Sequence, residues 1–127
     1  MKGWRFAVGI TASLLVIANG VMHTLVGWKV MRAALDAAGV GSDVVDNLGL
    51  GWTFGGVAMF AFGAIAIASF LARKRNPQAS LGAVAIIALA YLLFGIGAFV
   101  ASRFNPFFLV FIVPGALLGL AVWPEKA

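Results

Sequence analysis

The sequence predicts an all-α integral membrane protein, a bundle of four transmembrane helices in one domain that covers residues 1–127. Hydrophobic residues make up 63% of the chain and charged residues only 10%, whereas a soluble domain usually carries about 25% charged residues. Four stretches lack charged side chains altogether, at residues 6–28, 48–72, 80–102 and 107–123. Because hydrocarbon does not require a charged coat, lipid is the solvent that this pattern fits.

The four stretches fit helices better than strands of a barrel. A helix needs about 20 apolar residues to cross roughly 30 Å of hydrocarbon, whereas barrel strands alternate apolar and polar residues. Residues 60–68 read Phe-Ala-Phe-Gly-Ala-Ile-Ala-Ile-Ala and show no alternation. The fourth stretch is the shortest and contains Pro114, a candidate for a bend.

The first stretch shares features with a secretory signal peptide. Lys2 and Arg5 precede the apolar residues, and Val16-Ile17-Ala18 would be tolerated as a cleavage site. The apolar run nevertheless continues to Trp28, beyond the length of a typical signal sequence. We therefore expect a first helix that is retained.

The segment that joins the first two stretches has helical character. Arg32 and Asp36 are spaced as an i, i+4 ion pair, and Gly39 fits a helix C-terminus. Two structures remain open: a short amphipathic helix on the outer membrane surface, or a first helix that continues past Trp28 with a bend at Gly27. Further on, we expect side chains to cap another helical turn and then the second span, the candidates being Ser42, Asp43, Asp46 and Asn47.

The basic residues predict the orientation of the bundle. Lys2, Arg5, Arg73, Lys74, Arg75 and Lys126 would lie on one side, and Lys29, Arg32 and Arg103 on the other. Under the positive-inside rule this favours a multi-pass protein of the cell inner membrane with both termini in the cytoplasm. Arg73, Lys74 and Arg75 are the strongest topology anchors, with contact to anionic lipid headgroups as a secondary effect. The four tryptophans fall near helix ends, as expected at membrane interfaces: Trp4, Trp28, Trp52 and Trp123.

A few polar residues lie inside the predicted spans. Asn19 and His23 share one helical face. By depth, His23 is level with residues 53–56, and Asn19 with Tyr91 and Pro114. One interpretation is a small polar pocket that binds a lipophilic ligand, such as a quinone or a lipid, through Asn19, His23, Thr53 and Tyr91. The other is interhelical hydrogen bonding, worth roughly 0.6–2 kcal/mol per contact.

Small residues recur at a spacing that permits close helix contact. Gly51 and Gly55 form a small-xxx-small pair in the second stretch, and Gly115 and Gly119 form one in the fourth. These glycines are expected either to pack the helices of the chain together or to form a face for a partner helix or a second copy.

Several kinds of chemistry find no support in the sequence. Cysteine is absent and His23 is the single histidine, so no metal centre, cofactor or catalytic residue is predicted. The net charge of +5 comes from residues that flank the spans, so nucleic acid is not an expected partner. No Asp or Glu lies inside a span, which disfavours an ion-coupled transporter. Small multidrug resistance transporters depend on a glutamate in their first helix, and this chain has none there.

The layout resembles that of small bacterial four-helix membrane proteins of the DoxX-like kind. The resemblance lies in the basic start Lys2-Gly3-Trp4-Arg5, in Asn19 and His23 late in the first stretch, and in Asn105-Pro106-Phe107-Phe108 before the fourth. It implies a four-helix architecture, and some members of this group are associated with membrane redox partners.

Three hypotheses for function follow from the sequence. The first is a non-enzymatic accessory or assembly subunit of a membrane complex, whose partners are the lipid bilayer and another membrane protein or a second copy. The second is a binder of a lipophilic ligand, or a membrane subunit of an oxidoreductase, that uses Asn19, His23 and Tyr91. The third is a small transporter.

Overall fold

The structure, a computed structural model, describes residues 1–123. Every element in that range is helical: α1 (Gly3–Met22), the π-helical segment η1 (His23–Gly27), α2 (Trp28–Ala37), α3 (Ser42–Arg75), α4 (Gly82–Ala101), the 3₁₀ turn η2 (Pro106–Phe108) and α5 (Leu109–Val122). The all-α prediction is therefore confirmed. Three helices are long and apolar enough to cross a membrane, namely the continuous helix Gly3–Ala37, α3 and α4, whereas Pro106–Val122 is shorter.

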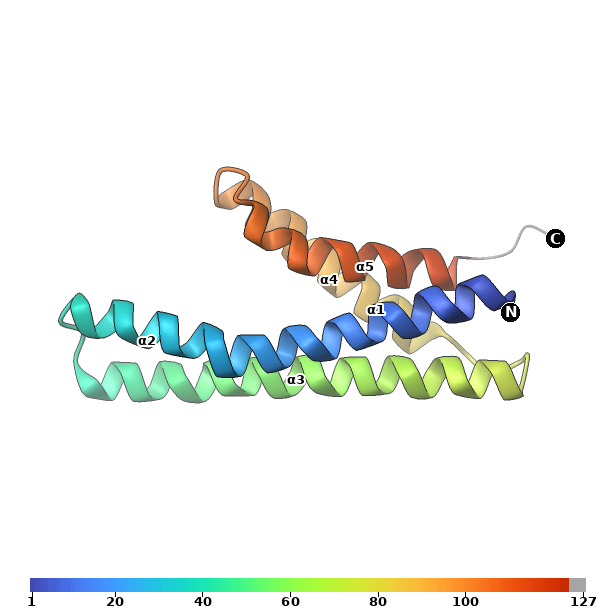
Figure 1. The fold of residues 1–127 in the computed structure, drawn as a ribbon, viewed down its shortest axis with the longest axis horizontal. Coiled ribbons are helices and arrows are strands. Elements are labelled where there is room, and N and C mark those ends of the chain that lie inside the picture. The colour runs from blue at the N-terminus through green and yellow to red at the C-terminus, as the bar shows by residue number, and fades with distance from the viewer. Residues whose placement is uncertain (124–127) are drawn as a thin grey trace.

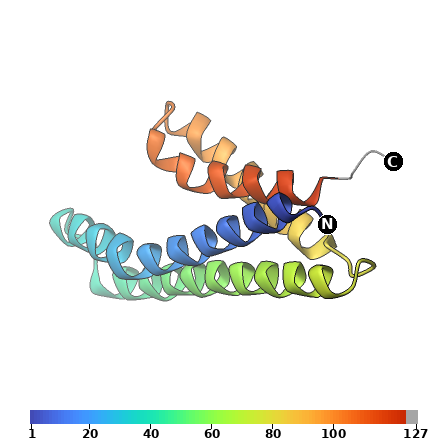
Figure 2. The ribbon, with the colours of Figure 1, turned by 45° about the vertical axis from the view of Figure 1, so that its right-hand side comes forward.

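The helices form two hairpins of unequal length. The first helix, made of α1, η1 and α2, runs antiparallel to α3, and α4 pairs with α5 (Figure 1). The α4–α5 hairpin packs against the long hairpin near the N-terminus and diverges from it toward the other end, which the turned view also shows (Figure 2). Within residues 1–123, η1 and α2 make no contact with α4 or α5. The buried core is therefore concentrated where the two hairpins meet.

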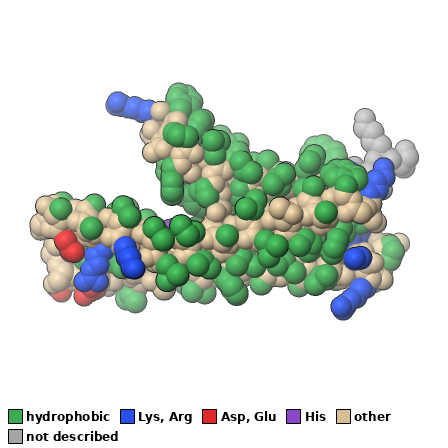
Figure 3. All heavy atoms as spheres, in the orientation of Figure 1, with side chains coloured by type: hydrophobic (Ala, Val, Ile, Leu, Met, Phe, Trp, Pro, Cys, Tyr) green, Lys and Arg blue, Asp and Glu red, His purple; other side chains and the backbone are tan. Residues whose placement is uncertain are grey.

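The register of the long hairpin aligns its two charge-free stretches. A side chain added at Gly9 would meet the ring of Phe70, and one added at Gly49 would meet the ring of Trp28. Residues 6–28 therefore lie beside residues 48–72. Figure 3 shows hydrophobic side chains along both hairpins, with Lys, Arg and acidic residues near the ends. The 35-residue first helix is about 52 Å long, so its charged end extends past the roughly 30 Å of a hydrocarbon layer.

The structure decides between the two alternatives for the first connecting segment. Residues 28–37 continue the first helix, and no separate surface helix is present in this segment. Gly39 has a φ of 69°, and the N–H groups of Gly39 and Val40 bond to the carbonyls of Asp36 and Leu35. This hydrogen-bond pattern is a Schellman motif, which confirms the predicted helix end. The ion pair between Arg32 and Asp36 is also present, at 4.0 Å between Nε and Oδ2.

The predicted caps of the second span are wrong. α3 begins at Ser42, so Asp46 and Asn47 lie inside the helix rather than before it. The Asn47 side chain donates to the carbonyl of Asp43 one turn earlier, at 2.9 Å, and the helix accommodates it without ending. Ser42 and Asp43 form the first turn of α3 without a side-chain cap bond, and the negative charge of Asp43 is favourable at a helix N-terminus.

A seam of small residues joins α1 to α3. On α3, the residues that meet the first helix recur every seven positions, at Gly49, Gly56, Gly63 and Phe70. An ideal Cβ placed on Gly20 would lie 2.8 Å from the backbone oxygen of Gly56. One placed on Gly63 would lie 2.8 Å from the backbone oxygen of Ser13. Glycine is needed at these points because the two backbones approach closely, and a seven-residue repeat keeps one helix face turned toward its partner.

We predict that Gly20→Ala destabilises the protein and that Gly51→Ala does not. The added methyl group at position 20 overlaps backbone atoms of α3, whereas nothing lies within 4 Å of a Cβ at position 51. The expected loss for Gly20→Ala is about 1–3 kcal/mol in free energy of unfolding, against about 0.5 kcal/mol or less for Gly51→Ala. Unfolding in mixed detergent micelles, followed by circular dichroism, measures both. Equal losses would mean that the seam does not hold the hairpin together.

Candidate functional site

Asn19 ties α1 to α5 at a carbonyl that proline leaves unpaired. Pro114 lies inside α5 and has no N–H, so the carbonyl of Val110, four residues earlier, lacks its usual helical donor. The side-chain nitrogen Nδ2 of Asn19 donates to that carbonyl oxygen at 2.6 Å. In apolar surroundings an unpaired carbonyl is costly, so this bond both satisfies α5 and joins it to α1.

His23 ties the first helix to α3 where the helix widens into η1. The imidazole Nε2 lies 3.1 Å from the carbonyl oxygen of Trp52, and the indole Nε1 of Trp52 donates to the carbonyl of His23 at 2.7 Å. The two rings stack in parallel with their centroids 4.4 Å apart. The Trp28 N–H also bonds to the His23 carbonyl, five residues back, which is the π-helical pattern. His23 is therefore held by its neighbours, at the depth that the sequence predicted.

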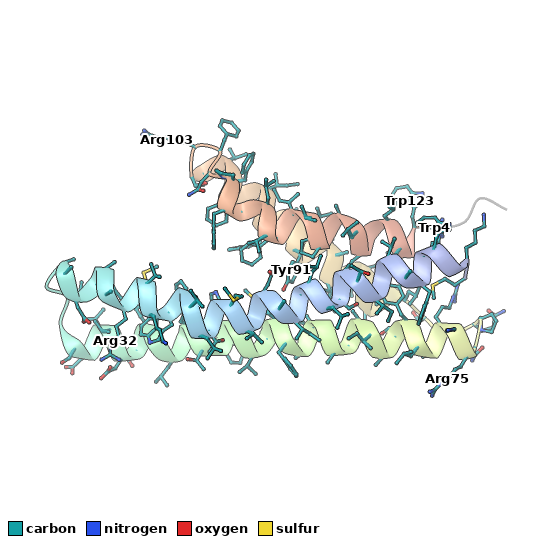
Figure 4. All side chains as sticks on the ribbon, in the orientation of Figure 1. Trp4, Arg32, Arg75, Tyr91, Arg103 and Trp123 are labelled. Carbon is teal, nitrogen blue, oxygen red and sulfur yellow. The ribbon has the colours of Figure 1, made fainter. Side chains whose placement is uncertain are left out.

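Tyr91 lies in the core near the junction of the two hairpins (Figure 4). It is 5% exposed and packs against Phe111, with the ring centroids 5.9 Å apart. Its hydroxyl oxygen is buried and has no hydrogen-bond partner among the described residues. A buried hydroxyl without a partner is uncommon in proteins. In this respect Tyr91 differs from Asn19 and His23, whose side chains make hydrogen bonds.

The structure does not gather the four predicted ligand-binding residues around one pocket. Asn19 bonds to α5, His23 bonds to α3 and Tyr91 is in the core, whereas Thr53 is exposed on α3. Neither of the two cavities described below is lined by any of them. Asn19 and His23 make interhelical hydrogen bonds of the kind that the packing interpretation describes, and a ligand-binding role for the four residues remains a hypothesis.

The four predicted glycines lie in two different environments. A Cβ on Gly115 would lie 2.9 Å from Cβ of Tyr91, and one on Gly55 would lie 3.2 Å from Nε2 of His23, so these two are at helix contacts. Gly51 and Gly119 face open space. The closest approach between the backbones of α1 and α3 uses Gly20, Gly56 and Gly63. The search for residues four apart missed them, although the seven-residue spacing on α3 relates Gly56 to Gly63.

Two cavities lie outside this set of residues. The first, of about 350 Å³, opens between the ends of four helices and is lined by Met1, Arg5, Arg73, Leu81, Ala121, Val122 and Trp123. The second is a shallow, apolar groove of about 280 Å³ over the crossing of α1 and α3, lined by Gly20, Val21, Thr24, Leu25, Gly56, Val57 and Phe60. Sequence analysis predicted neither cavity, because each is formed by residues far apart in the chain.

Neither a metal site nor a similar protein identifies the function of these residues. Within residues 1–123, no group of three or more His, Asp or Glu side chains is placed to hold a metal ion. Protein-family models, curated proteins and solved structures contain no match to this chain. The resemblance to DoxX-like proteins therefore remains a prediction from layout.

We predict that the cost of Asn19→Ala depends on Pro114. With proline present, Asn19→Ala leaves the Val110 carbonyl unpaired and should cost roughly 0.6–2 kcal/mol. In a Pro114→Ala background the new N–H bonds to that carbonyl, so the same change should cost less, by about 0.5 kcal/mol or more. A double-mutant cycle from unfolding in mixed micelles measures the coupling. Thr53→Ala, at an exposed position, serves as the control and should show no coupling to Pro114; absence of coupling at Asn19 would contradict the proposed role.

Proposed function

We propose that this chain is a four-span protein of the bacterial inner membrane that acts as an accessory or assembly subunit of a membrane complex. The proposal has two parts, a membrane topology and a docking groove, and each has its own support and its own test.

The pairing of α4 with α5 supports a fourth crossing. α4 has 20 residues and α5 has 14, which correspond to about 30 Å and, with η2 included, roughly 25 Å. Trp123 lies near Trp4 at one end of the molecule, and Arg103 lies at the far end of the α4–α5 hairpin (Figure 4). An even number of crossings puts both termini on one side, where Arg73, Lys74 and Arg75 also lie, and the positive-inside rule assigns that side to the cytoplasm.

We predict that single cysteines at Ser42 and Asn105 are labelled from outside the cell and that one at Gln78 is not. The natural chain has no cysteine, so each variant carries one reactive thiol without background. A membrane-impermeant maleimide is applied to intact spheroplasts and, as the control, to lysed ones, in which all three positions should react. Labelling of Gln78 together with Ser42 before lysis would exclude the proposed topology.

The groove over the α1–α3 crossing is the observation that carries the proposed subunit role. Small residues form its floor, with Gly20 and Gly56 buried and Thr24 half-buried. Larger side chains form its rims, and Val57 and Leu25 are each 60% exposed. Such a hollow lets the backbone of another helix approach closely. Because the groove lies within the aligned charge-free stretches, the occupant it fits is an apolar transmembrane helix of a partner protein.

We predict that a photoreactive residue in the groove crosslinks one defined membrane protein. The amino acid p-benzoylphenylalanine replaces Val57 in the groove or, as the control, Ile86 on α4, which is 71% exposed. After irradiation of the native membrane, position 57 should give a discrete product that position 86 does not give. Val57→Trp, which fills the groove, should then lower co-purification of that protein with the chain, whereas Ile86→Trp should not.

Other outcomes of the crosslinking experiment would overturn this role. A product with the mass of two chains would mean that the groove joins copies of the protein. Equal, diffuse products at both positions would mean that only lipid occupies the groove.

The lipophilic binder remains a second candidate because of one observation, the buried hydroxyl of Tyr91 without a partner. A quinone carbonyl or a lipid ester could accept its hydrogen bond. Mass spectrometry of a lipid extract of the same purified protein decides this candidate. A quinone present with the natural chain and lost with Tyr91→Phe would support it, and an extract that does not change would exclude it.

A further inference from the structure

The cavity at the basic end of the molecule brings together two arginines from distant parts of the chain. Arg5 comes from the start of α1 and Arg73 from the end of α3, while the start of the α4 segment and the end of α5 complete the walls. Its volume of about 350 Å³ is within the range of about 300–1,000 Å³ that is usual for small-molecule sites. The cavity therefore has both the size and the charge of an anion-binding site.

Backbone contacts hold both guanidinium groups in place. Arg5 Nη1 donates to the carbonyl of Trp123 at 2.5 Å, and Arg73 Nη1 donates to the carbonyl of Ala79 at 2.7 Å. A guanidinium carries five N–H donors in a rigid fork that matches phosphate and carboxylate geometry. The bond from Arg73 to Ala79 uses one of these donors and leaves others that can bind an anion in the cavity.

The charges of the molecule favour an anion at this end. Lys2, Lys74 and Arg75 lie close in sequence to the two cavity arginines, while Glu125 and Lys126, which follow Trp123 in the sequence, carry opposite charges. Among the described residues the acidic ones are Asp36, Asp43 and Asp46, all near the opposite end of the long hairpin. At about 1.5 Å per residue they are tens of ångströms away, beyond the screening length of roughly 8–10 Å.

The rest of the lining points to a lipid rather than to a free ion. Leu81, Ala121 and Val122 form apolar walls next to the arginines. Trp4 and Trp123 are exposed at the same end, as is typical of side chains at the level of lipid headgroups. Basic pockets between transmembrane helices bind anionic headgroups by this combination of charge and apolar surface.

We propose that this cavity binds the phosphate of an anionic phospholipid headgroup, with Arg73 as its ligand. Arg73 is a binding residue in this site in addition to any role in topology. The site is separate from the groove proposed for a partner helix, so it does not depend on that proposal.

The test titrates short-chain phosphatidylglycerol into the purified full chain in neutral detergent and measures Kd by native mass spectrometry. We expect saturable binding, with phosphatidylcholine several-fold weaker. Arg73→Gln should raise Kd about fivefold, the effect of one basic residue at a lipid surface. Arg75→Gln makes the same charge change on an exposed residue outside the cavity and should alter Kd by less than about twofold.

Several results would overturn the proposal. Equal effects of Arg73→Gln and Arg75→Gln would reduce the binding to general surface charge. Equal binding of phosphatidylcholine would remove the need for an anion, and displacement of the lipid by inorganic phosphate, beyond that by chloride at the same ionic strength, would make the site one for free phosphate. Leu81→Trp fills the cavity without a charge change and should also raise Kd. It decides the question if Arg73→Gln does not fold, and an unchanged Kd in that folded variant would refute the site.

Discussion

A polar group in apolar surroundings is costly unless it is hydrogen-bonded, and this constraint explains how the polar residues of the long apolar helices are used. Pro114 removes one N–H from α5, and the Val110 carbonyl that loses its donor is bonded by Asn19 of α1. The hydrogen bond that α5 loses at Pro114 is thereby replaced by one between α5 and α1. The carbonyl of His23 likewise accepts the indole N–H of Trp52 where the first helix widens into η1. Polar side chains inside the bundle therefore serve mainly to place one helix against another.

The first helix is the element that these contacts share. One side of α1 packs on α3 along the glycine seam, and α1 also contacts α5. Beyond Asn19 the first helix keeps its contact with α3 but loses its contact with α5. In the described part of the chain, η1 and α2 make no contact with the α4–α5 hairpin. The two hairpins are thus packed together at the basic end of the molecule and separate from each other toward the opposite end. A division of this kind leaves helix surfaces without an intramolecular neighbour, so lipid or another protein must cover them.

The helices could be predicted from the sequence because charge-free length is a local property. The ends of α4 and the turn at Gly39 followed from neighbouring residues. Depth matching placed His23 level with residues 53–56, and the imidazole lies beside Gly55 of that range. The caps at Asp46 and Asn47 failed since a polar side chain can bond to its own helix instead of ending it. Gly55 and Gly115 lie at helix contacts whereas Gly51 and Gly119 face open space, because spacing alone does not say which neighbours each glycine meets. The Arg5–Arg73 cavity needed the tertiary fold, which brings the ends of α1 and α3 together.

The proposed lipid cavity and the proposed helix groove lie at different heights along the long hairpin. Arg5 and Gly20 are on the same helix, so their separation is roughly 22 Å along its axis. Changes at sites this far apart, with no shared contacts, usually act independently. A lipid held at the basic end would fix the height of the long hairpin in the membrane, and the groove would then be presented at a constant level to a partner helix. The closely packed seam between α1 and α3 runs between the two proposed sites.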